Sequence, residues 1–330
     1  MGRLFLERVE AMPLGVNLRD LFPQHPVPEG WYDGKRIAVD GPNVAFRYLT
    51  SVRGKDGDVL RNRDGRAIAH LLGFCNLVRH LRLRGAEPIV VWDGPVHARK
   101  RATVDERNER RLEAALNAEE AKAAGDAAAH RKFLRATTIL DRAMVEDATR
   151  LLSCLGVAAI RAPEDGERYA AALCRDGQAQ AVATEDFDAL VAGAPFVLRR
   201  AGSQQPFLHK LEDLAAHGLD GMQLRHVAIL CGTDWHPGVR GFGAKTATAL
   251  VRSQPLPELV AAAEAGGTER AHLLIREAGL TSSVLAELDA FIANVPKPEP
   301  IQAPKPDPAK AAETARELGV DPAKVFACFC

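Results

Sequence analysis

The sequence predicts an α/β fold in which helices flank a mostly parallel central sheet. Three observations support this class. Short runs rich in Val, Ile and Ala recur through the first 200 residues, helical patterns separate them, and acidic residues follow several of the runs. Alternating strand and helix signals are typical of βαβ units, which build parallel sheets.

Five strands are expected, at 36–40, 88–92, 157–160, 179–183 and 195–199. Helices are expected between them, at 43–53, 67–84, 99–125, 130–155 and 164–176. After about residue 210 the strand signals stop, and short helices are expected near 211–217, 222–231, 244–253 and 269–293. Regularly spaced prolines from 296 to 308 indicate an extended linker, which a short helical stretch at 309–318 follows.

The chain therefore divides into four expected parts, which are an N-terminal extension (1–14), a core (15–265), a C-terminal helical part (266–295) and a tail rich in Pro and Ala (296–330). The 330 residues are 47% hydrophobic, enough for one large domain with appendages or two smaller ones. Lys and Arg total 43, as do Asp and Glu, so bulk charge gives no argument for nucleic acid binding.

The expected setting is intracellular, in the cytoplasm or nucleoid, or in the nucleus of a eukaryote. The six cysteines show no metal-type CxxC spacing, and a chain of this length needs no disulfide staples. The first 14 residues lack the apolar run of a signal peptide, and no stretch approaches membrane-spanning length. We expect no membrane partner.

Seven acids stand at the most informative places in the sequence. Most follow an apolar run or open a helix: Asp40, Asp93, Asp165, Glu167, Asp186, Asp188 and Asp234. Ligands of an open α/β sheet gather outside the carboxyl ends of its strands, so these acids should converge. Carboxylates alone favour Mg²⁺ or Mn²⁺ over zinc. Seven exceed the needs of one Mg²⁺, whereas two ions about 4 Å apart would use them and suit phosphodiester hydrolysis.

Each acid taken alone has another interpretation. Asp often caps a helix or orders a turn, and acids in the first turn of a helix interact favourably with the helix dipole. The pair Asp186 and Asp188 would point to one side if the backbone there is extended. Asp165 and Glu167 could share an ion only at a helix start, because i and i+2 do not face each other on a helix.

A helical insertion over 95–150 begins directly after Asp93, with Gly125 as the expected break between two helices. Four of its cations are candidates to neutralise a polyanionic substrate beside the acids: Arg99, Lys100, Arg101 and Arg107. The alternative is a solvated helical hairpin held by i,i+4 ion pairs.

A glycine-rich turn at 238–243 leads into a helix that starts near Ala244. Backbone amides at such a turn can hold a phosphate, and Lys245 adds charge. The alternative is a plain turn between helices. The spacing does not match a P-loop, and no strand precedes it as in a dinucleotide fingerprint.

These motifs, in this order, resemble the flap endonuclease family of structure-specific 5′ nucleases, the XPG/Rad2-like family, most of all its archaeal and eukaryotic flap endonucleases. The likeness runs from about Gly15 to Leu250, through 37–40, 91–94, 107–111, 162–167, 183–188, 230–234 and 238–247. It implies a PIN-like core, a helical arch at about 95–145 and a helix–two-turn–helix element at about 225–255. It also implies Mg²⁺-dependent 5′ flap endonuclease and 5′–3′ exonuclease activity near the single-strand/double-strand junction, in DNA replication and repair.

The resemblance implies roles for individual residues. Asp40, Asp93, Asp165 and Glu167 match one metal group, and Asp186, Asp188 and Asp234 the other, for two Mg²⁺ that Mn²⁺ can replace. Lys100 and Arg107 match the arch cations that contact the scissile phosphate. The remaining DNA-binding candidates are Phe46, Arg99, Arg110, Arg111, Gly241, Gly243 and Lys245. Phe46 would stack on a base, or alternatively pack in the core, and the glycine turn would also hold K⁺.

The chain departs from the family in four places. Gly41-Pro42 replaces the usual small-residue pair after the first Asp. Asp165-Gly166-Glu167 stands where Glu-Ala-Glu is usual, so the shorter Asp165 is expected to reach its ion directly or through a water. The stretch that usually opens the family's chains matches Leu14–Asp20, after an extra segment. The sliding-clamp box is not recognisable in the tail, where Phe326 and Phe329 are poor substitutes. The expected partner is branched DNA with a 5′ flap, and the expected state is a monomer.

Three alternatives stay open. The first is a related nuclease that prefers gaps, bubbles or nicked ends, which substrate comparison would separate. The second is a non-catalytic DNA-junction binder, which would gain nothing from crowded acids beside phosphate. The third is a metal-dependent phosphatase on another α/β fold, which would not need the basic insertion or the glycine turn.

Overall fold

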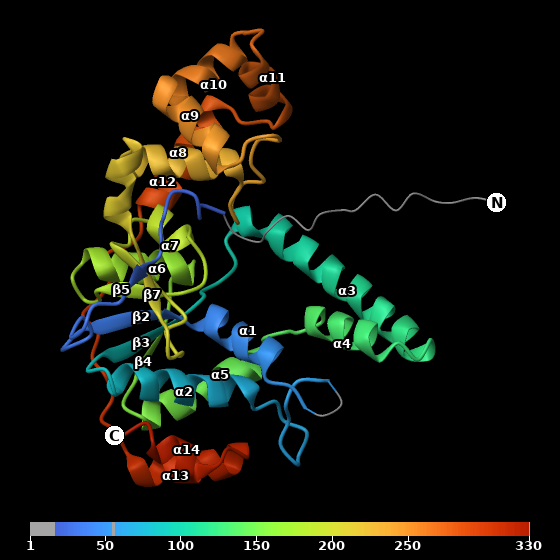
Figure 1. Ribbon diagram of the computed structural model, residues 1–330, viewed down its shortest axis with the longest axis vertical. Helices are drawn as coiled ribbons and strands as arrows, with labels where there is room; N and C mark the ends of the chain where they lie inside the picture. The colour runs from blue at the N-terminus through green and yellow to red at the C-terminus, as the bar shows by residue number, and fades with distance from the viewer. Residues whose placement is uncertain (1–16, 55–56, 330) are drawn as a thin grey trace.

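The computed structural model describes residues 17–54 and 57–329, and within them a seven-stranded sheet lies at the centre (Figure 1). The strand order is β1-β7-β6-β5-β2-β3-β4. The bounds are β1 His25–Pro26, β2 Arg36–Asp40, β3 Glu87–Trp92, β4 Ala158–Arg161, β5 Ala181–Ala183, β6 Phe196–Arg199 and β7 Phe207–Lys210. Strands β6, β5, β2, β3 and β4 are parallel, while β7 and β1 add an antiparallel edge. The predicted α/β class with a mostly parallel sheet is confirmed.

The register of the central strands brings several chain segments to one edge of the sheet. Strand β2 pairs with β3 so that Asp40 lies opposite Val91, and with β5 so that Val39 lies opposite Ala183. The residues that follow β2, β3 and β5 therefore leave the sheet side by side at its carboxyl edge.

Helices cover both faces of the sheet. The helical elements are α1 Gly41–Ser51, α2 Ala69–Arg82, the 3-10 turn η1 Ala98–Lys100, α3 Arg101–Ala123, α4 Ala127–Ala136, α5 Arg142–Cys154, α6 Gly166–Arg175, α7 Asp188–Val191, the 3-10 turn η2 Leu211–His217, α8 Gly221–Cys231, α9 Ala244–Ser253, α10 Leu256–Glu264, α11 Arg270–Glu277, α12 Ser282–Ala293, α13 Pro308–Leu318 and α14 Pro322–Phe326. One core lies under α1, α2, α5, α13 and α14, and the other joins the sheet to α6–α12.

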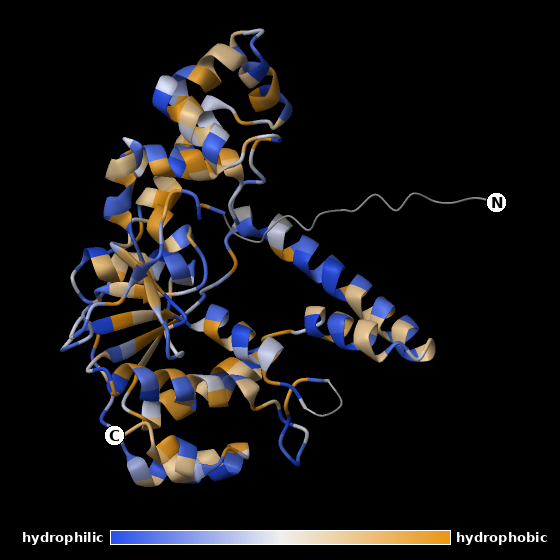
Figure 2. Ribbon diagram, in the orientation of Figure 1, coloured by the Kyte–Doolittle hydropathy of each residue, from blue (hydrophilic) through white to orange (hydrophobic). Residues whose placement is uncertain are grey.

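Helices α3 and α4 form an arm that projects from the body of the molecule (Figure 1). They pack on each other through small side chains of α3, of which Ala114, Ala118 and Ala121 are buried. Gly125 makes the break between them with φ of +72°, a conformation that favours glycine. Figure 2 shows α3 as largely hydrophilic, in contrast to the central strands.

The structure differs from the sequence prediction in several elements. Strands β1 and β7 were not expected, because both are short and β7 carries His209 and Lys210. The helix expected at 130–155 is two helices, since Asp141 ends the intervening loop and caps α5 by accepting from Met144 N at 2.8 Å. The helix expected at 269–293 is also two, because Thr281 caps α12, and α10 had no predicted counterpart.

The proline-rich stretch after α12 runs along the body to α13 and α14 (Figure 1). The amide of Gln178 holds it, because its Oε1 accepts from Ile301 N at 2.8 Å and its Nε2 donates to Glu299 O at 3.0 Å. Ala315 of α13 and Val325 of α14 are fully buried in the core beneath α2 and α5. The C-terminal helices therefore belong to the packed body. Across 17–54 and 57–329, none of the helices is long and apolar enough to cross a membrane.

Candidate active site

Asp40 is the last residue of β2 and the N-cap of α1. Its Oδ1 accepts from Asn43 N at 3.1 Å, and its Oδ2 accepts from Thr184 Oγ1 at 3.0 Å. The next residue must be glycine, because a Cβ on Gly41 would lie 2.7 Å from the Trp92 ring. Strand and helix thus meet in a tight turn that fixes the carboxylate at the sheet edge.

Asp93 follows β3 and is held by the start of α6. Its Oδ1 accepts from Gly166 N at 2.8 Å. A Cβ on Gly166 would lie 2.8 Å from that same oxygen, so the glycine leaves room for the contact. Asp165 caps α6 by accepting from Arg168 N at 2.9 Å, and Glu167 lies in the first turn. The two acids therefore flank a helix start, the one place where neighbouring positions can serve a shared site.

The backbone between Asp186 and Asp188 is helical, not extended, and the two carboxylates nevertheless lie close together. Asp188 begins the short helix α7, and Phe187 is its N-cap with helical dihedral angles. Phe187 is buried and stacks on Phe22 at 5.8 Å, so a core contact between the two acids bends the chain. Asp186 is anchored through its own backbone N–H, which donates to Thr184 Oγ1 at 3.2 Å.

The acids of α6 and of the β5–α7 turn form a candidate metal site. One carboxylate oxygen from each of Glu167, Asp186 and Asp188 lies within 4.8 Å of the others. Glu167 Oε1 and Asp188 Oδ1 are buried without a hydrogen-bond partner. Orphaned buried carboxylate oxygens are costly unless a cation satisfies them, and an all-oxygen donor set fits a hard divalent ion. The residues present therefore fit a metal.

The pKa values of these acids express the same crowding. Burial, then Asp186 and Asp40, raise the pKa of Glu167 well above its usual value, and burial with Asp186 does so for Asp188. Burial and the neighbouring Asp93 raise the pKa of Asp40 to about 7. Burial raises the pKa of Asp186 to about 6. A cation at this site would reverse these shifts by stabilising the ionised forms.

Lys100, at the foot of the arm, contacts the acid cluster, the name used here for the seven predicted acids together. Its ammonium pairs with Asp165 and lies 3.7 Å from Asp234 Oδ2. Burial would raise the pKa of Asp165, but the pairing with Lys100 holds it below its usual value. Burial would likewise lower the pKa of Lys100, but Asp165, Asp234 and Asp93 raise it. Lys100 is therefore charged and aimed at the site.

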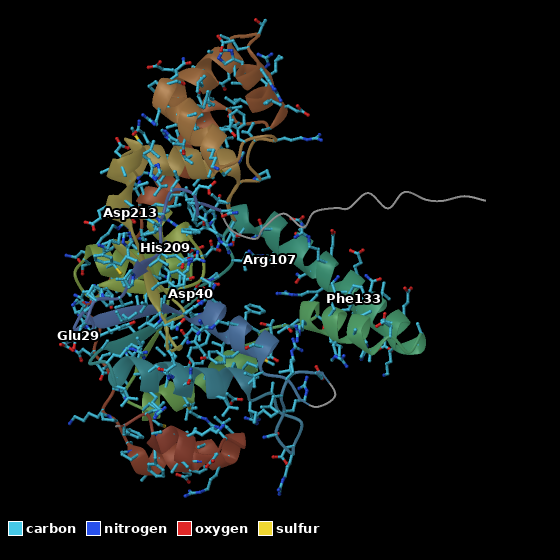
Figure 3. All side chains as sticks on the ribbon, viewed as in Figure 1. Glu29, Asp40, Arg107, Phe133, His209 and Asp213 are labelled. Carbon is cyan, nitrogen blue, oxygen red and sulfur yellow. The ribbon has the colours of Figure 1, made fainter. Side chains whose placement is uncertain are left out.

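Arg107, two turns further along α3, binds Asp234 with Nη2 at 2.8 and 2.9 Å from its two carboxylate oxygens. Thr103 Oγ1 donates to Asp234 O at 3.0 Å, so three positions of the arm face the same side. In Figure 3, Asp40 lies beside the central strands and Arg107 near the sheet end of α3. Acids and arm cations, distant in sequence, share one site.

The other predicted arm residues differ in placement. The Arg111 guanidinium lies 5.6 Å from the Phe46 ring, so this partly exposed aromatic of α1 faces the arm. Arg110 pairs with Glu106 on its own helix. The side chain of Arg99 and the extension at 1–14 lie outside the described part of the chain.

The glycine turn lies between α8 and α9, outside the acid cluster. Gly241 has φ of +87°, and Gly243 is the exposed N-cap of α9. Nothing lies within 4 Å of a Cβ placed at either glycine, so their backbone faces open space. The Lys245 side chain is 84% exposed, with Asp20 at 3.7 Å.

Sequence reasoning missed residues that support the site. Thr184 links Asp40 to Asp186, and Gly166 binds Asp93, although both stand beside predicted ligands. Arg168, 2% exposed, donates its backbone N–H to Asp165 Oδ1 and its Nη1 to Glu164 Oε2. The available signal for Thr184 was its place as a short polar residue two positions before Asp186. No sequence signal reveals the long-range contacts of Arg168.

Comparison with known proteins gives the same class. The XPG N-terminal domain matches residues 25–114, and the XPG I-region matches 156–234. Flap endonuclease 1 of Methanosphaerula palustris is 32% identical over 263 residues, 75% of this chain and 79% of that protein. Flap endonuclease 1 of Aeropyrum pernix is 36% identical over 259 residues, 73% of this chain and 74% of that protein.

Solved structures agree on the fold. Flap endonuclease-1 from Methanococcus jannaschii matches with a TM-score of 0.69 and 27% identity, covering 96% of this chain and 98% of that one. The catalytic core of Rad2 in complex with DNA substrate has the same TM-score at 18% identity, with coverage of 94% and 96%, which supports the fold alone. Fold and site thus define an XPG/Rad2-type nuclease. The chain belongs to the flap endonuclease family.

Proposed function

We propose that this protein is a Mg²⁺-dependent, structure-specific 5′ flap endonuclease with 5′–3′ exonuclease activity, acting on branched DNA in replication and repair. The observation that carries the proposal is the meeting of the acid cluster with Lys100 and Arg107 of the arm. Acids alone would suit many metal enzymes. Acids faced by cations from a projecting helix suit a polyanionic substrate held between them.

The acids would divide between two ions. Asp40, Asp93, Asp165 and Glu167 would serve one, and Asp186, Asp188 and Asp234 the other, with Glu167 near the boundary because it lies beside Asp186 and Asp188. When bound, a pair of Mg²⁺ or Mn²⁺ ions supplies a hydroxide nucleophile and stabilises the leaving oxygen. Asp165 pairs with Lys100, which favours an indirect ligand role through water.

The protein's own cations would orient the scissile phosphate. Lys100 pairs with Asp165 and Arg107 pairs with Asp234 at the site. The oxygens of an entering phosphate would replace these carboxylates as partners of the two cations. Phe46 and Arg111, already in contact, would receive the base beside the cut through stacking. Arg99 and Arg110 would contact the strand's backbone as it passes along the arm.

The duplex would be gripped at a distance from the cut. Gly241 and Gly243 leave backbone groups open, and Lys245 offers an exposed charge, as phosphate contacts require. K⁺ would bind at the same turn.

We further propose a monomer that works inside the cell, built from a nuclease core at 15–265, helices at 266–295 and a tail at 296–330. Clamp recruitment through the tail is not favoured, because its binding box is not recognisable in the sequence.

The deciding experiment is cleavage of an end-labelled 5′-flap duplex with Mg²⁺, compared with the same reaction in excess chelator. We expect a product cut near the junction only with the metal. Gap, bubble and nicked duplexes of the same sequence run beside it. Faster cleavage of one of these would reassign the substrate within the family, and metal-independent cleavage would contradict the proposed chemistry.

A further inference from the structure

Three aromatic side chains from distant parts of the chain meet at the foot of the arm. They are His97 just before η1, Trp235 just after Asp234, and Phe291 near the end of α12, and we call them the foot cluster. The rings of His97 and Phe291 lie 4.4 Å apart, and those of Trp235 and Phe291 lie 5.8 Å apart, edge to face. None of these residues is a predicted metal ligand or DNA contact.

The foot cluster contacts both the side chain and the backbone of Lys100. The Lys100 ammonium lies 5.8 Å from the centroid of the Trp235 ring, within cation–π range. The Lys100 backbone N–H donates to His97 O at 2.9 Å, which closes the turn where the arm begins. Both the ammonium and the backbone of Lys100 are therefore set by residues that pack on Phe291.

Phe291 is itself held by Arg168. The Arg168 guanidinium carbon lies 3.5 Å from the Phe291 ring centroid, and its Nη2 donates to Phe291 O and, at 3.1 Å, to Asn294 O. Arg168 belongs to α6, whose N-cap is Asp165 and whose first turn carries Glu167. The ring thus lies at the junction of the acid-bearing helix, the arm and α12.

The end of the molecule that carries the glycine turn shares this junction. Helix α12 packs on α8, and the ion pair between Arg225 and Asp289 ties them at 2.6 Å. Helix α8 leads directly to Asp234 and Trp235. Long lysine side chains have many rotamers, and a small displacement of a catalytic group lowers a rate strongly. A rigid aromatic stack at the foot restricts where the Lys100 ammonium can lie.

From these contacts we infer that Phe291 is a positioning residue for phosphodiester cleavage. Through His97 and Trp235 it holds Lys100 against the acids, and it needs no contact with DNA to do so. This inference rests on the proposed nuclease function. It predicts that loss of the Phe291 ring slows the chemical step while leaving flap binding unchanged.

The test is a double-mutant cycle between Phe291→Leu and Lys100→Met, measured as single-turnover cleavage of a 5′-flap duplex at saturating enzyme and Mg²⁺. Phe291→Leu alone should lower the rate about tenfold, with the flap Kd changed less than about twofold. In the Lys100→Met background the same substitution should change the rate less than about twofold, because its target is gone. Phe291→Tyr, which keeps the ring, should restore most of the rate.

Phe196→Leu is the matched control, since Phe196 of β6 is also partly buried, and its ring packs on Trp31 at 5.9 Å and belongs to neither the seven acids nor the foot cluster. It should leave the rate unchanged. An equal loss from Phe291→Leu in both backgrounds, or no loss in either, would overturn the inference. If Phe291→Leu unfolds, His97→Leu probes the same stack from the arm under the same criteria. Failure of the wild-type protein to cut a flap would instead refute the proposed function.

Discussion

Lys100 and Lys245 both serve DNA in the proposed complex, but their surroundings are opposite. The Lys100 side chain is 21% exposed, pairs with Asp165 and packs over Trp235. The Lys245 side chain is 84% exposed, and its partner Asp20 is itself 57% exposed. The first lysine is held by tertiary contacts in an acidic environment, whereas the second extends from the N-terminus of α9 beside open glycines.

The difference separates two kinds of recognition in one molecule. A cation that is ion-paired and packed acts at a fixed point, so changes near it should alter the chemical step. An exposed cation contributes through long-range attraction, which salt screens. Substitutions at the acid cluster should therefore change rates, and substitutions at the glycine turn should change affinity.

The largest expected effect comes from Asp186→Asn, which removes a charge from the acid cluster. Cleavage of a 5′ flap in Mg²⁺ should fall by about a thousandfold or more, because a shared metal loses a carboxylate ligand. Flap binding measured by fluorescence anisotropy should persist, since repulsion of the phosphates decreases. Glu212→Gln, an exposed acid on η2, is the control. Undiminished turnover in Asp186→Asn would remove this residue from the site.

A smaller loss is expected from Gly166→Ala. Alanine favours a helix more than glycine does, so the melting temperature should not fall. The new Cβ would nevertheless lie 2.8 Å from Asp93 Oδ1 and displace that carboxylate. We expect single-turnover cleavage about tenfold slower, since a catalytic carboxylate is moved. Gly221→Ala, where nothing lies within 4 Å, is the control. Equal rates in the two variants would show that Asp93 tolerates the shift.

Lys245→Ala should alter affinity and not rate. Loss of one phosphate contact should weaken flap binding several-fold at low salt and reduce the slope of log K against log salt by about 0.9. The rate at saturating enzyme should stay unchanged. Lys305→Ala, an exposed lysine of the proline-rich stretch, should change neither quantity. A rate defect in Lys245→Ala would break the proposed separation between the two regions.

The smallest effect on cleavage is expected from His70→Gln. This substitution tests the contribution of His70 to folding stability. Burial lowers the pKa of His70 to about 4, and its Nε2 hydrogen-bonds Met144 O at 3.1 Å. The unfolded chain binds this proton near pH 6.5, so folding stability from His70 is full above that pH and is lost as pH falls toward 4. Wild type should lose about 2 kcal/mol more than His70→Gln between pH 7 and 5.

Urea unfolding of both proteins at the two pH values measures this difference. Cleavage at pH 7.5 should be equal, because α2 packs on the core that it shares with α1 and α5 and carries no site residue. Parallel loss of stability in both proteins would assign the acid sensitivity to other groups.

Much of the site was readable from the sequence because its ligands follow strand ends or helix starts. Asp40, Asp93 and the acids of α6 stand at such positions, and the sheet register brings them together. The backbone conformation around Asp186 could not be predicted, because it depends on a core contact of Phe187. Strands β1 and β7 escaped prediction because short antiparallel edge strands carry little periodicity.

Local pattern and residue chemistry were enough to predict the α/β class, the set of seven acids, the basic insertion and the glycine turn. The folded chain was needed to show which acids share a site, that Lys100 pairs with Asp165, and that Phe291 of α12 packs against the foot of the arm. Those contacts join residues up to almost 200 positions apart. Their partners are selected by packing and burial, which no local pattern in the sequence encodes.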